Sequence, residues 1–407
     1  MPQSVNCPKP TPVVYIDPGT GRGGASRSLY YLVAGLDRSR WRPVIILLKD
    51  NPLFDWYVKL GVSCECLTDI PRFSLGERKN WAAFAYFLWR MRDFSTLSKS
   101  VARALDGDSG ILHVNHENLA LTGWLLARRL EIPWNCHIRT TPAPTWSARL
   151  VYRFIAKQCS RVIFISQGVE SHFRDLAGSK AKENSQIVLN PFTLSTSHKP
   201  LASALDPKRL QFRVLTLSNI TPDKGIDRQL EVAEVLRRRN ETGIIFLICG
   251  QPQYRSMNPF KIDYFKFVLA KMREKDLGEF VEFTGHISPP EIALAASDVL
   301  IKLGRENTPW GRDLIEAMTA GLPIVTLGDD QSFVANGING FIDSVYDPEK
   351  VADHIIKLRD NAEMRAQMGK ANREKAASLF SPEISARAIS MLYEELLARS
   401  VSGPTTI

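Results

Sequence analysis

Short runs of apolar residues alternate with longer amphipathic stretches along the first half of the chain. Apolar runs bounded by turn residues are typical of buried strands, and apolar positions three or four apart are typical of helices. Strands separated by helices predict a parallel sheet with crossover helices. The expected strands are 13–17, 43–48, 111–114, 134–139 and 161–166, and the expected helices lie near 25–37, 80–105, 118–130, 146–158 and 167–177.

The same alternation restarts after a segment at 194–206 that is rich in Ser, Pro, Lys and His and is the best linker candidate. Near the end of the chain, Ser381-Pro382-Glu383 is a start signal for a final helix. Two successive α/β domains are therefore expected. In the second, strands are expected at 213–218, 244–249, 280–284, 298–303 and 323–327, and helices near 225–239, 258–276, 311–320, 348–359 and 362–398.

Residues 304–328 carry the clearest chemical signal. They follow an apolar strand, contain Pro309 and Gly311, continue as a helix that includes Glu316, and close at Gly321-Leu322-Pro323 before another strand. The free N–H groups and the positive dipole end at such a helix start suit a phosphate. The Glu316 carboxylate suits a sugar or ribose diol, although an ordinary surface helix with an exposed Glu explains the same pattern.

The run from Gly311 to Pro323 resembles the donor-site segment of retaining GT-B glycosyltransferases of family 4. In that family one glutamate contacts the donor ribose and another contacts the donor sugar. Glu316 matches the ribose glutamate, whereas Thr308 stands where the family has the sugar glutamate. Glu306 or Asp313 is the candidate to replace that carboxylate. The resemblance marks as donor-binding Thr308, Pro309, Trp310, Gly311, Arg312, Asp313 and Glu316.

This resemblance implies an α/β chain with the GT-B fold, in which two Rossmann-like domains with parallel sheets face a central cleft. It also implies retention of anomeric configuration, no metal ion and no cofactor beyond the nucleotide-sugar donor. The expected domains are 1–195 for the acceptor, 207–380 for the nucleotide-sugar donor, and 381–407 as a C-terminal helix that returns to the N-terminal domain.

A loop at 218–225 follows a strand and opens a helix, and it is similar to the family pattern G-R-x-x-P-E-K-G. The Arg and Lys of that pattern clamp the donor pyrophosphate. Lys224 matches the Lys, whereas Asn219 replaces the Arg. A Lys at a helix start opposes the dipole, which favours a functional reason for Lys224. The pyrophosphate is expected to be held by Lys224 and backbone N–H groups, with Arg312 as a further candidate.

A glycine-rich loop at 19–24 satisfies G-x-G-x-x-G after the first strand, and Asp50 lies near the end of the second. This dinucleotide fingerprint predicts, as one alternative, an NAD-dependent Rossmann oxidoreductase. The glycosyltransferase family has a G-G-A loop here, matched by Gly23 and Gly24, whose backbone approaches the donor phosphate and the acceptor. A plain turn is the third interpretation.

Further candidates lie at strand ends, because open parallel sheets bind ligands at the carboxyl ends of their strands. Related enzymes place a His where His137 follows its apolar strand, although a lone His on such a strand is more often structural. The expected catalytic residues are His137, Lys224 and Glu316, the expected acceptor contacts are His113, His116 and Arg139, and the further donor contacts are Gly23, Gly24, Asn219, Gly250 and His286.

The net charge of +9 is unevenly distributed. Residues 1–200 contain 26 Lys and Arg against 15 Asp and Glu, whereas residues 201–407 have a slight acidic excess. A basic half indicates an anionic partner. Nucleic acid is not expected, because no reader motif is present. An anionic membrane surface or a phosphate-bearing lipid acceptor fits better, and a basic surface without such a partner is the plain alternative.

The expected helix at 80–105 bears on this choice. Its apolar positions recur at 81, 84, 88 and 91 and then at 97, 101 and 105. Such a helix either lies on an anionic bilayer or packs its apolar stripe into the domain core, and the pattern favours the core. Its other face carries Arg78, Lys79, Arg90, Arg92, Lys99 and Arg103.

The protein is expected to lie in the cytoplasm. Peripheral attachment to the inner face of the membrane is a further expectation. The polar, Pro-rich N-terminus lacks the apolar region of a signal peptide. No apolar run approaches the roughly 18 residues of a membrane helix. The six cysteines form no C-x-x-C pair, so neither a zinc site nor a disulfide framework is indicated.

Together with these features, the resemblance implies a retaining, metal-independent glycosyltransferase of the hexosyltransferase type. It is expected to move a sugar from a nucleotide-sugar to a hydroxyl of a glycan or lipid-linked acceptor. The departures at Thr308 and Asn219 leave a second possibility, a catalytically weakened GT-B protein that binds nucleotide or glycan. The oxidoreductase remains the least favoured alternative.

Overall fold

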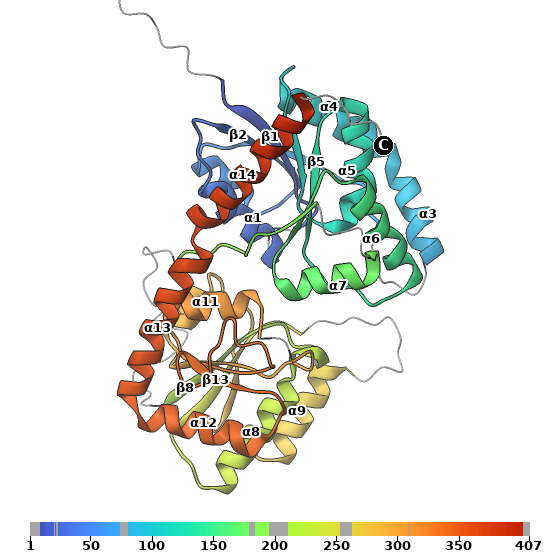
Figure 1. Cartoon of the computed structure of the whole chain (residues 1–407). Coiled ribbons are helices and arrows are strands. Elements are labelled where there is room, and N and C mark those ends of the chain that lie inside the picture. Colours follow the sequence, from blue (N-terminus) through green and yellow to red (C-terminus); the bar gives the residue numbers. More distant parts are fainter. Residues whose placement is uncertain are drawn as a thin grey trace, which may run out of the picture. The chain divides into compact units, whose positions relative to one another are not determined.

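The computed structural model of the protein describes residues 9–19, 21, 23–73, 80–178, 184–194, 211–252, 263–307 and 309–401. The chain forms two compact units (Figure 1). The first unit consists of Met1–Pro191 and Phe380–Ile407, and the second of Phe192–Leu379. Within the described residues, no helix has both the length and the apolar character needed to span a bilayer.

The first unit contains a parallel sheet in the order β3-β2-β1-β4-β5-β6-β7. Its central strands are almost fully buried, as expected for a sheet with helices on both faces. The edge strands β3 and β7 are partly exposed and lack a continuous apolar run, which is why the sequence pattern missed them. The strands are β1 Thr11–Ile16, β2 Trp41–Leu48, β3 Ser63–Leu67, β4 Ile111–Val114, β5 Trp134–Ile138, β6 Arg161–Phe164 and β7 Ser185–Ile187.

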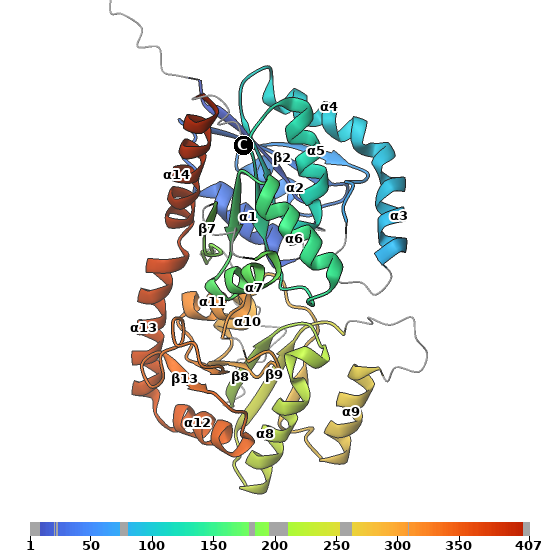
Figure 2. The ribbon, with the colours of Figure 1, turned by 45° about the vertical axis from the view of Figure 1, so that its right-hand side comes forward.

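The C-terminal helix α14 (Pro382–Val401) belongs to this first unit. Ile389, Leu392 and Tyr393 join the core formed by β1, β2 and α1. In Figures 1 and 2, α1 and α14 lie on one side of the sheet, and α4 and α5 lie on the other. The other helices of the unit are α1 Gly24–Ala34, α2 Phe54–Lys59, α3 Asn80–Arg90, α4 Phe94–Leu105, α5 Ala120–Leu130, α6 Trp146–Gln158 and α7 Gln167–Ala177.

The predicted single helix at 80–105 is wrong in two respects. A short 3-10 segment, Met91–Asp93, separates α3 from α4. The predicted apolar stripe holds on α4 but not on α3, where Phe84 and Leu88 are exposed and Phe87 is buried. Periodicity identified residues that share a helix face but chose the wrong face of α3 for the core.

The second unit contains a parallel sheet in the order β10-β9-β8-β11-β12-β13, flanked by helices. Two such Rossmann-like sheets confirm the predicted fold class. Its strands are β8 Phe212–Leu217, β9 Ile244–Cys249, β10 Val281–Phe283, β11 Val299–Lys302, β12 Ile324–Leu327 and β13 Gly340–Asp343, and its helices are α8 Ile226–Arg238, α9 Tyr264–Glu274, α10 Glu291–Ala295, α11 Arg312–Ala320, α12 Pro348–Asp360 and α13 Ala362–Phe380.

Each sheet has a topological switch point, where the strand order reverses direction. In the first unit it lies between β1 and β4, and in the second between β8 and β11. Ligands bind open parallel sheets in the crevice at such a point, beyond the carboxyl ends of the strands. The residues that follow these four strands are therefore the first candidates for function.

Candidate functional site

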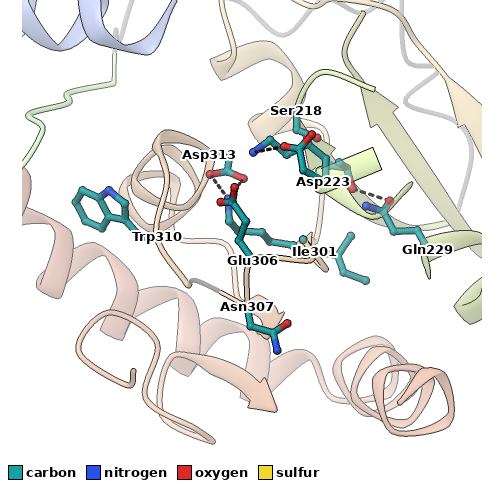
Figure 3. Close-up of a pocket in the computed structure, with 12 residues that line it drawn as sticks. Ser218, Asp223, Gln229, Ile301, Glu306, Asn307, Trp310 and Asp313 are labelled. Atoms are coloured by element: carbon teal, nitrogen blue, oxygen red, sulfur yellow. Dashed lines mark hydrogen bonds and ion pairs between the residues drawn. The ribbon is translucent and has the colours of Figure 1, made fainter. Parts of the chain in front are cut away.

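A pocket in the second unit lies at its switch point (Figure 3). Its walls come from the segments after β8 and β11 and from the start of α11. Charged and uncharged polar side chains together form most of these walls, so the pocket suits a polar, charged ligand. The lining residues are Thr216, Ser218, Asp223, Lys224, Gln229, Ile301, Lys302, Gly304, Glu306, Asn307, Trp310 and Asp313.

Lys224 reaches the pocket from a 3-10 turn, Pro222–Lys224, directly after β8. Gly225 closes this turn with a left-handed φ of 67°. A Cβ atom at Gly225 would lie 2.2 Å from the carbonyl oxygen of Leu303, so only glycine lets the turn pack against the end of β11. The Lys224 Nζ lies 3.2 Å from Asp223 Oδ2, and the side chain is 38% exposed, so its ammonium remains accessible to a ligand.

Lys302 is a second cation in the pocket, which sequence reasoning missed. It sits at the end of β11, where its Nζ lies 2.8 Å from Asp313 Oδ2 and 3.0 Å from Oδ1. A Cβ at Gly311 would lie 2.3 Å from Asp313 Oδ1 and 2.8 Å from Lys302 Nζ, so the ion pair packs directly against the glycine backbone. The available signal was a lysine within an otherwise apolar strand.

Arg305 joins the turn that carries Lys224 to the loop after β11, the strand that carries Lys302. Its guanidinium binds both carboxylate oxygens of Asp227 at 3.0 and 2.5 Å and also donates to the carbonyl of Pro222. Its backbone N–H donates to the carbonyl of Asp223 at 2.9 Å. Bidentate pairs of this kind fix geometry as well as charge. The loop after β11 is therefore tied to the turn that presents Lys224.

Helix α11 begins beside the pocket with Gly311 as its N-cap. Glu316 is buried on the second turn, and its Oε1 lies 2.9 Å from Arg312 Nε. Trp310 lies at the pocket edge, with its ring centroid 4.6 Å from that of Phe333. The start of α11 therefore gathers Trp310, Asp313 and the N-terminal backbone N–H groups of the helix next to both lysines, and Glu316 lies one turn further along the helix.

The remaining predicted donor residues that the structure describes do not line the pocket of the second unit. Asn219 and His286 are exposed. Gly250 follows β9, where a Cβ would lie 1.8 Å from the carbonyl oxygen of Ser218, so it permits close packing behind the pocket. Pro309 is buried beside Trp310. Thr308 lies outside the described residues.

A buried polar network lies at the switch point of the first unit. His113 Nε2 is 3.3 Å from His137 Nδ1, and His113 Nδ1 is 2.7 Å from the hydroxyl of Tyr393 on α14. The Tyr393 hydroxyl donates to that of Tyr15 at 2.9 Å. Burial lowers the pKa of both imidazoles well below the usual value for histidine, and the Arg139 guanidinium acts in the same direction. Both are therefore neutral near pH 7.

Arg139 is the centre of the polar cluster beside these histidines. Its guanidinium donates to Asn115 Oδ1 at 2.5 Å and to Asn190 Oδ1 at 2.6 Å, and its backbone N–H donates to Glu117 Oε2 at 2.9 Å. Asn115 also donates to Asp17 Oδ1 at 3.3 Å. Asp17 and Asn115 were not predicted as site residues, and the sequence signal for them was their place directly after the buried strands β1 and β4.

Two buried polar atoms of this cluster, His137 Nε2 and Asp17 Oδ2, have no hydrogen-bond partner in the part of the chain that the structure describes. Buried polar atoms are rarely left unpaired, so both are candidates to contact a ligand or water. His116 is partly exposed and accepts from the N–H of Asn118 at 3.2 Å. Gly23 and Gly24 are exposed at the start of α1, and a Cβ at Gly23 would meet nothing within 4 Å.

The histidine pair predicts acid sensitivity. Unfolded histidines bind protons with a pKa of about 6.5, whereas His113 and His137 resist protonation in the folded chain. The unfolded state then binds more protons, so the free energy of unfolding is expected to fall below about pH 6.5, by up to ~1.4 kcal/mol per pH unit for each histidine. Urea unfolding between about pH 7.5 and 5 measures this slope.

The control for this measurement is the variant His113→Gln with His137→Gln. It removes both titrating groups, so its unfolding free energy should depend less on pH in the same window. Equal slopes in the wild type and the variant would show that other groups cause the acid sensitivity.

Each of the two units matches the model of a known protein family. Residues 23–188 match the model of the glycosyl transferase 4-like domain, and residues 204–375 match that of glycosyl transferases group 1. The first match begins at the loop that carries Gly23 and Gly24, and the second includes both pocket lysines. The predicted glycosyltransferase family is thereby confirmed, and the oxidoreductase alternative is set aside.

Individual relatives match over shorter segments. Spore coat protein SA of Bacillus subtilis (strain 168) is 31% identical over 125 residues, which are 30% of this chain and 33% of that protein. A D-inositol 3-phosphate glycosyltransferase of Corynebacterium efficiens is 28% identical over 212 residues, which are 51% of this chain and 47% of that protein. The chain therefore spans less than half the length of either relative.

A solved structure matches over nearly the whole chain. Anabaena HepE in complex with UDP superposes with a TM-score of 0.73 and 17% identity, covering 95% of this chain and 100% of that one. The same protein has also been solved with UDP-glucose. At this identity the likeness concerns the fold, and it agrees with the predicted GT-B architecture.

Proposed function

Because the two halves of this chain are the two domains of a GT-B glycosyltransferase, we propose that the protein transfers a sugar from a nucleotide-sugar to a hydroxyl of a glycan or lipid-linked acceptor. The observation that carries this proposal is the pocket of the second unit. Two lysines, Lys224 and Lys302, line it beside the start of α11. Ammonium groups and helix N-terminal N–H groups together suit a diphosphate.

The nucleotide-sugar donor is proposed to be held through two parts of its nucleoside diphosphate, the pyrophosphate and the ribose. The lysines and the N-terminus of α11 hold the pyrophosphate, and Lys302 supplies the second cation that Asn219 cannot. Glu316 accepts hydrogen bonds from the ribose diol. For this contact it turns from Arg312, its present partner at 2.9 Å. UDP and UDP-glucose are the ligands named for HepE, so uridine nucleotides are the first to test.

The donor sugar needs a carboxylate in place of the one lost at Thr308. Glu306 and Asp313 both line the pocket, and Figure 3 shows them among its side chains. Asp313 is already oriented by Lys302, whereas Glu306 is exposed on the loop. We therefore assign Asp313 the contact to the sugar hydroxyls and keep Glu306 as the second choice.

The reaction is proposed to retain anomeric configuration without a metal ion. The bond from the anomeric carbon to the diphosphate oxygen breaks as a bond to the acceptor oxygen forms on the same face. The acceptor proton passes to the departing phosphate. Negative charge grows on the diphosphate, where Lys224, Lys302 and the helix N–H groups stabilise it.

The acceptor is proposed to bind at the switch point of the first unit. His116, Arg139 and the unpaired Nε2 of His137 offer polar contacts there, and His113 fixes the orientation of His137 through their hydrogen bond. The basic excess of residues 1–200 supports an acceptor that carries phosphate or lies at an anionic membrane. We therefore propose that the enzyme works at the cytoplasmic face of a membrane.

A transfer assay with a panel of nucleotide-sugars tests the function. Each of UDP-glucose, UDP-N-acetylglucosamine and GDP-mannose is incubated with the full chain and a glycolipid extract, and release of the nucleoside diphosphate is measured with and without acceptor. Acceptor-dependent release from one donor is the expected result. Binding of a nucleoside diphosphate without any turnover would instead support the weakened, ligand-binding alternative.

A further inference from the structure

Helix α3 of the first unit exposes a run of large apolar side chains. Phe84 is 41% exposed, Tyr86 54%, Leu88 55% and Trp89 53%. Among the side chains described for this helix, Phe87 and Arg90 are the buried ones. Over residues 84–90 the helix therefore buries only a narrow stripe, and its other side chains face outward. We call the four exposed side chains the α3 face.

The α3 face is not the result of a loosely attached helix. The ring of Phe87 packs edge-on against Phe73, with centroids 6.2 Å apart. Arg90 forms an ion pair with Asp69 and is 5% exposed. Arg90, expected on the cationic face of the helix, is thus a structural anchor. These two contacts fix which side of α3 faces outward.

The next three α-helices, α4, α5 and α6, are basic and contain no acidic residue. Like α3, their sequences include neither Asp nor Glu. Helix α4 contacts α5 and α5 contacts α6, so these three form one layer over the sheet. In Figures 1 and 2 this layer lies on the side of the sheet away from α14, and α3 continues from it. The exposed basic residues of the layer are Lys99, Arg103, Arg128, Arg129, Arg149, Arg153 and Lys157.

Helix α6 also exposes large apolar side chains, and it carries exposed cations beside them. Trp146 and Leu150 are 59% and 55% exposed, and Arg149, Arg153 and Lys157 are exposed on the same helix. None of these three cations is in an ion pair among the described residues. Apolar side chains next to uncompensated positive charge are costly to leave in water but favourable at an anionic bilayer surface.

We propose that the α3 face, flanked by the basic layer α4–α6, docks on an anionic phospholipid bilayer. Aromatic rings of Tyr and Trp prefer the level of the lipid headgroups, and Lys and Arg are attracted to their phosphates. Arg92 already stacks over the Trp89 ring at 3.7 Å from its centroid, which places the guanidinium where it can meet a phosphate as the ring inserts. This inference deepens the proposed function, since it brings a lipid surface to the unit assigned to the acceptor.

The test is binding of the full chain to sedimented vesicles of phosphatidylcholine, with and without phosphatidylglycerol. The wild type is expected to bind only when phosphatidylglycerol is present, and less well as salt is raised. The variant Leu88→Ser with Trp89→Ser should lose most of this binding. The matched control, Ile338→Ser with Val345→Ser, removes two apolar side chains that are 65% and 75% exposed on the second unit, and it should bind as the wild type does.

The charged layer has its own variant, Arg149→Gln with Arg153→Gln and Lys157→Gln. Each neutralised charge is expected to weaken vesicle binding about fivefold. Arg90 is left unchanged because its loss would disturb the fold. If the wild type ignores anionic vesicles at low salt, or if the α3 variant and the control lose binding equally, the proposal is wrong.

Two further measurements distinguish lipid binding from nucleic-acid binding and from the proposed transferase function. Displacement of the protein from vesicles by single-stranded RNA, together with RNA binding that depends on the same side chains, would overturn the lipid assignment in favour of nucleic acid. Calorimetric binding of a nucleoside diphosphate should be unchanged in the α3 variant. A chain that binds vesicles but no nucleotide would refute the proposed function alone, and one that transfers sugar but ignores vesicles would refute only this inference.

Discussion

Replacing Lys224 and Lys302 together with methionine is expected to weaken binding of a nucleoside diphosphate by about 3 kcal/mol, roughly a hundredfold in affinity. Each lysine lines the pocket and lies within 3.2 Å of a carboxylate. A phosphate would accept further charged hydrogen bonds from the same ammonium groups, which keep their carboxylate partners, and each such bond contributes about 1.5 kcal/mol or more. Titration calorimetry of the variant against the wild type measures the loss.

The free nucleoside is the diagnostic ligand, because it lacks the phosphates. Its affinity should change little in the double variant, whereas a folding defect would weaken both ligands alike. Lys370→Met is the matched control, since this lysine on α13 is 75% exposed and lies outside the pocket. If single variants show that only Lys224 contributes, Lys302 is a structural partner of Asp313 and not a phosphate ligand.

Replacing Glu316 with glutamine is expected to cost about 1.5–3 kcal/mol of binding free energy for both the nucleoside and the nucleoside diphosphate. The proposed partner of Glu316 is the ribose diol, which both ligands share. Glutamine keeps the size of the buried side chain but loses the charge that strengthens its hydrogen bonds to hydroxyl groups. In calorimetry, the Glu316 variant should therefore bind both ligands more weakly, whereas the lysine variant should bind only the nucleoside diphosphate more weakly.

Glu316 also faces Arg312, so its replacement leaves a cation on the same helix with a weaker partner. The thermal midpoint of the variant therefore has to be compared with that of the wild type before affinities are interpreted. A 2′-deoxynucleoside diphosphate provides the control ligand. If the wild type binds it as tightly as the ribonucleotide, and the variant binds both equally well, the ribose contact is refuted.

Short sequence patterns were sufficient to predict a structural element when all the residues that form it lie in one segment of the chain. The strand–turn–helix unit with Lys224 and the start of α11 were predicted within a residue or two, because glycine, proline and periodicity act over a few positions. Edge strands β3 and β7 were missed, since half-exposed strands lack the continuous apolar run that marks a central one.

The candidate site shows the limit of local information. The attachment of Arg305 to Asp227 depends on two loops that meet only after β8 and β11 pair, and the pairing of Lys302 with Asp313 depends on how α11 folds back against the end of β11. The contact between His113 and Tyr393 joins residues 280 positions apart. Nothing in the sequence around either residue identifies the other as its partner, so these contacts followed only from the fold.

Local sequence patterns were enough to define two parallel α/β domains, a glycine-punctuated loop that presents Lys224, a helix start suited to phosphate, and a basic first half. The tertiary structure alone decided which polar residues share a pocket and which side of α3 faces outward. Periodicity defines the faces of a helix, whereas the contacts of Phe87 with Phe73 and of Arg90 with Asp69 determine which face is buried.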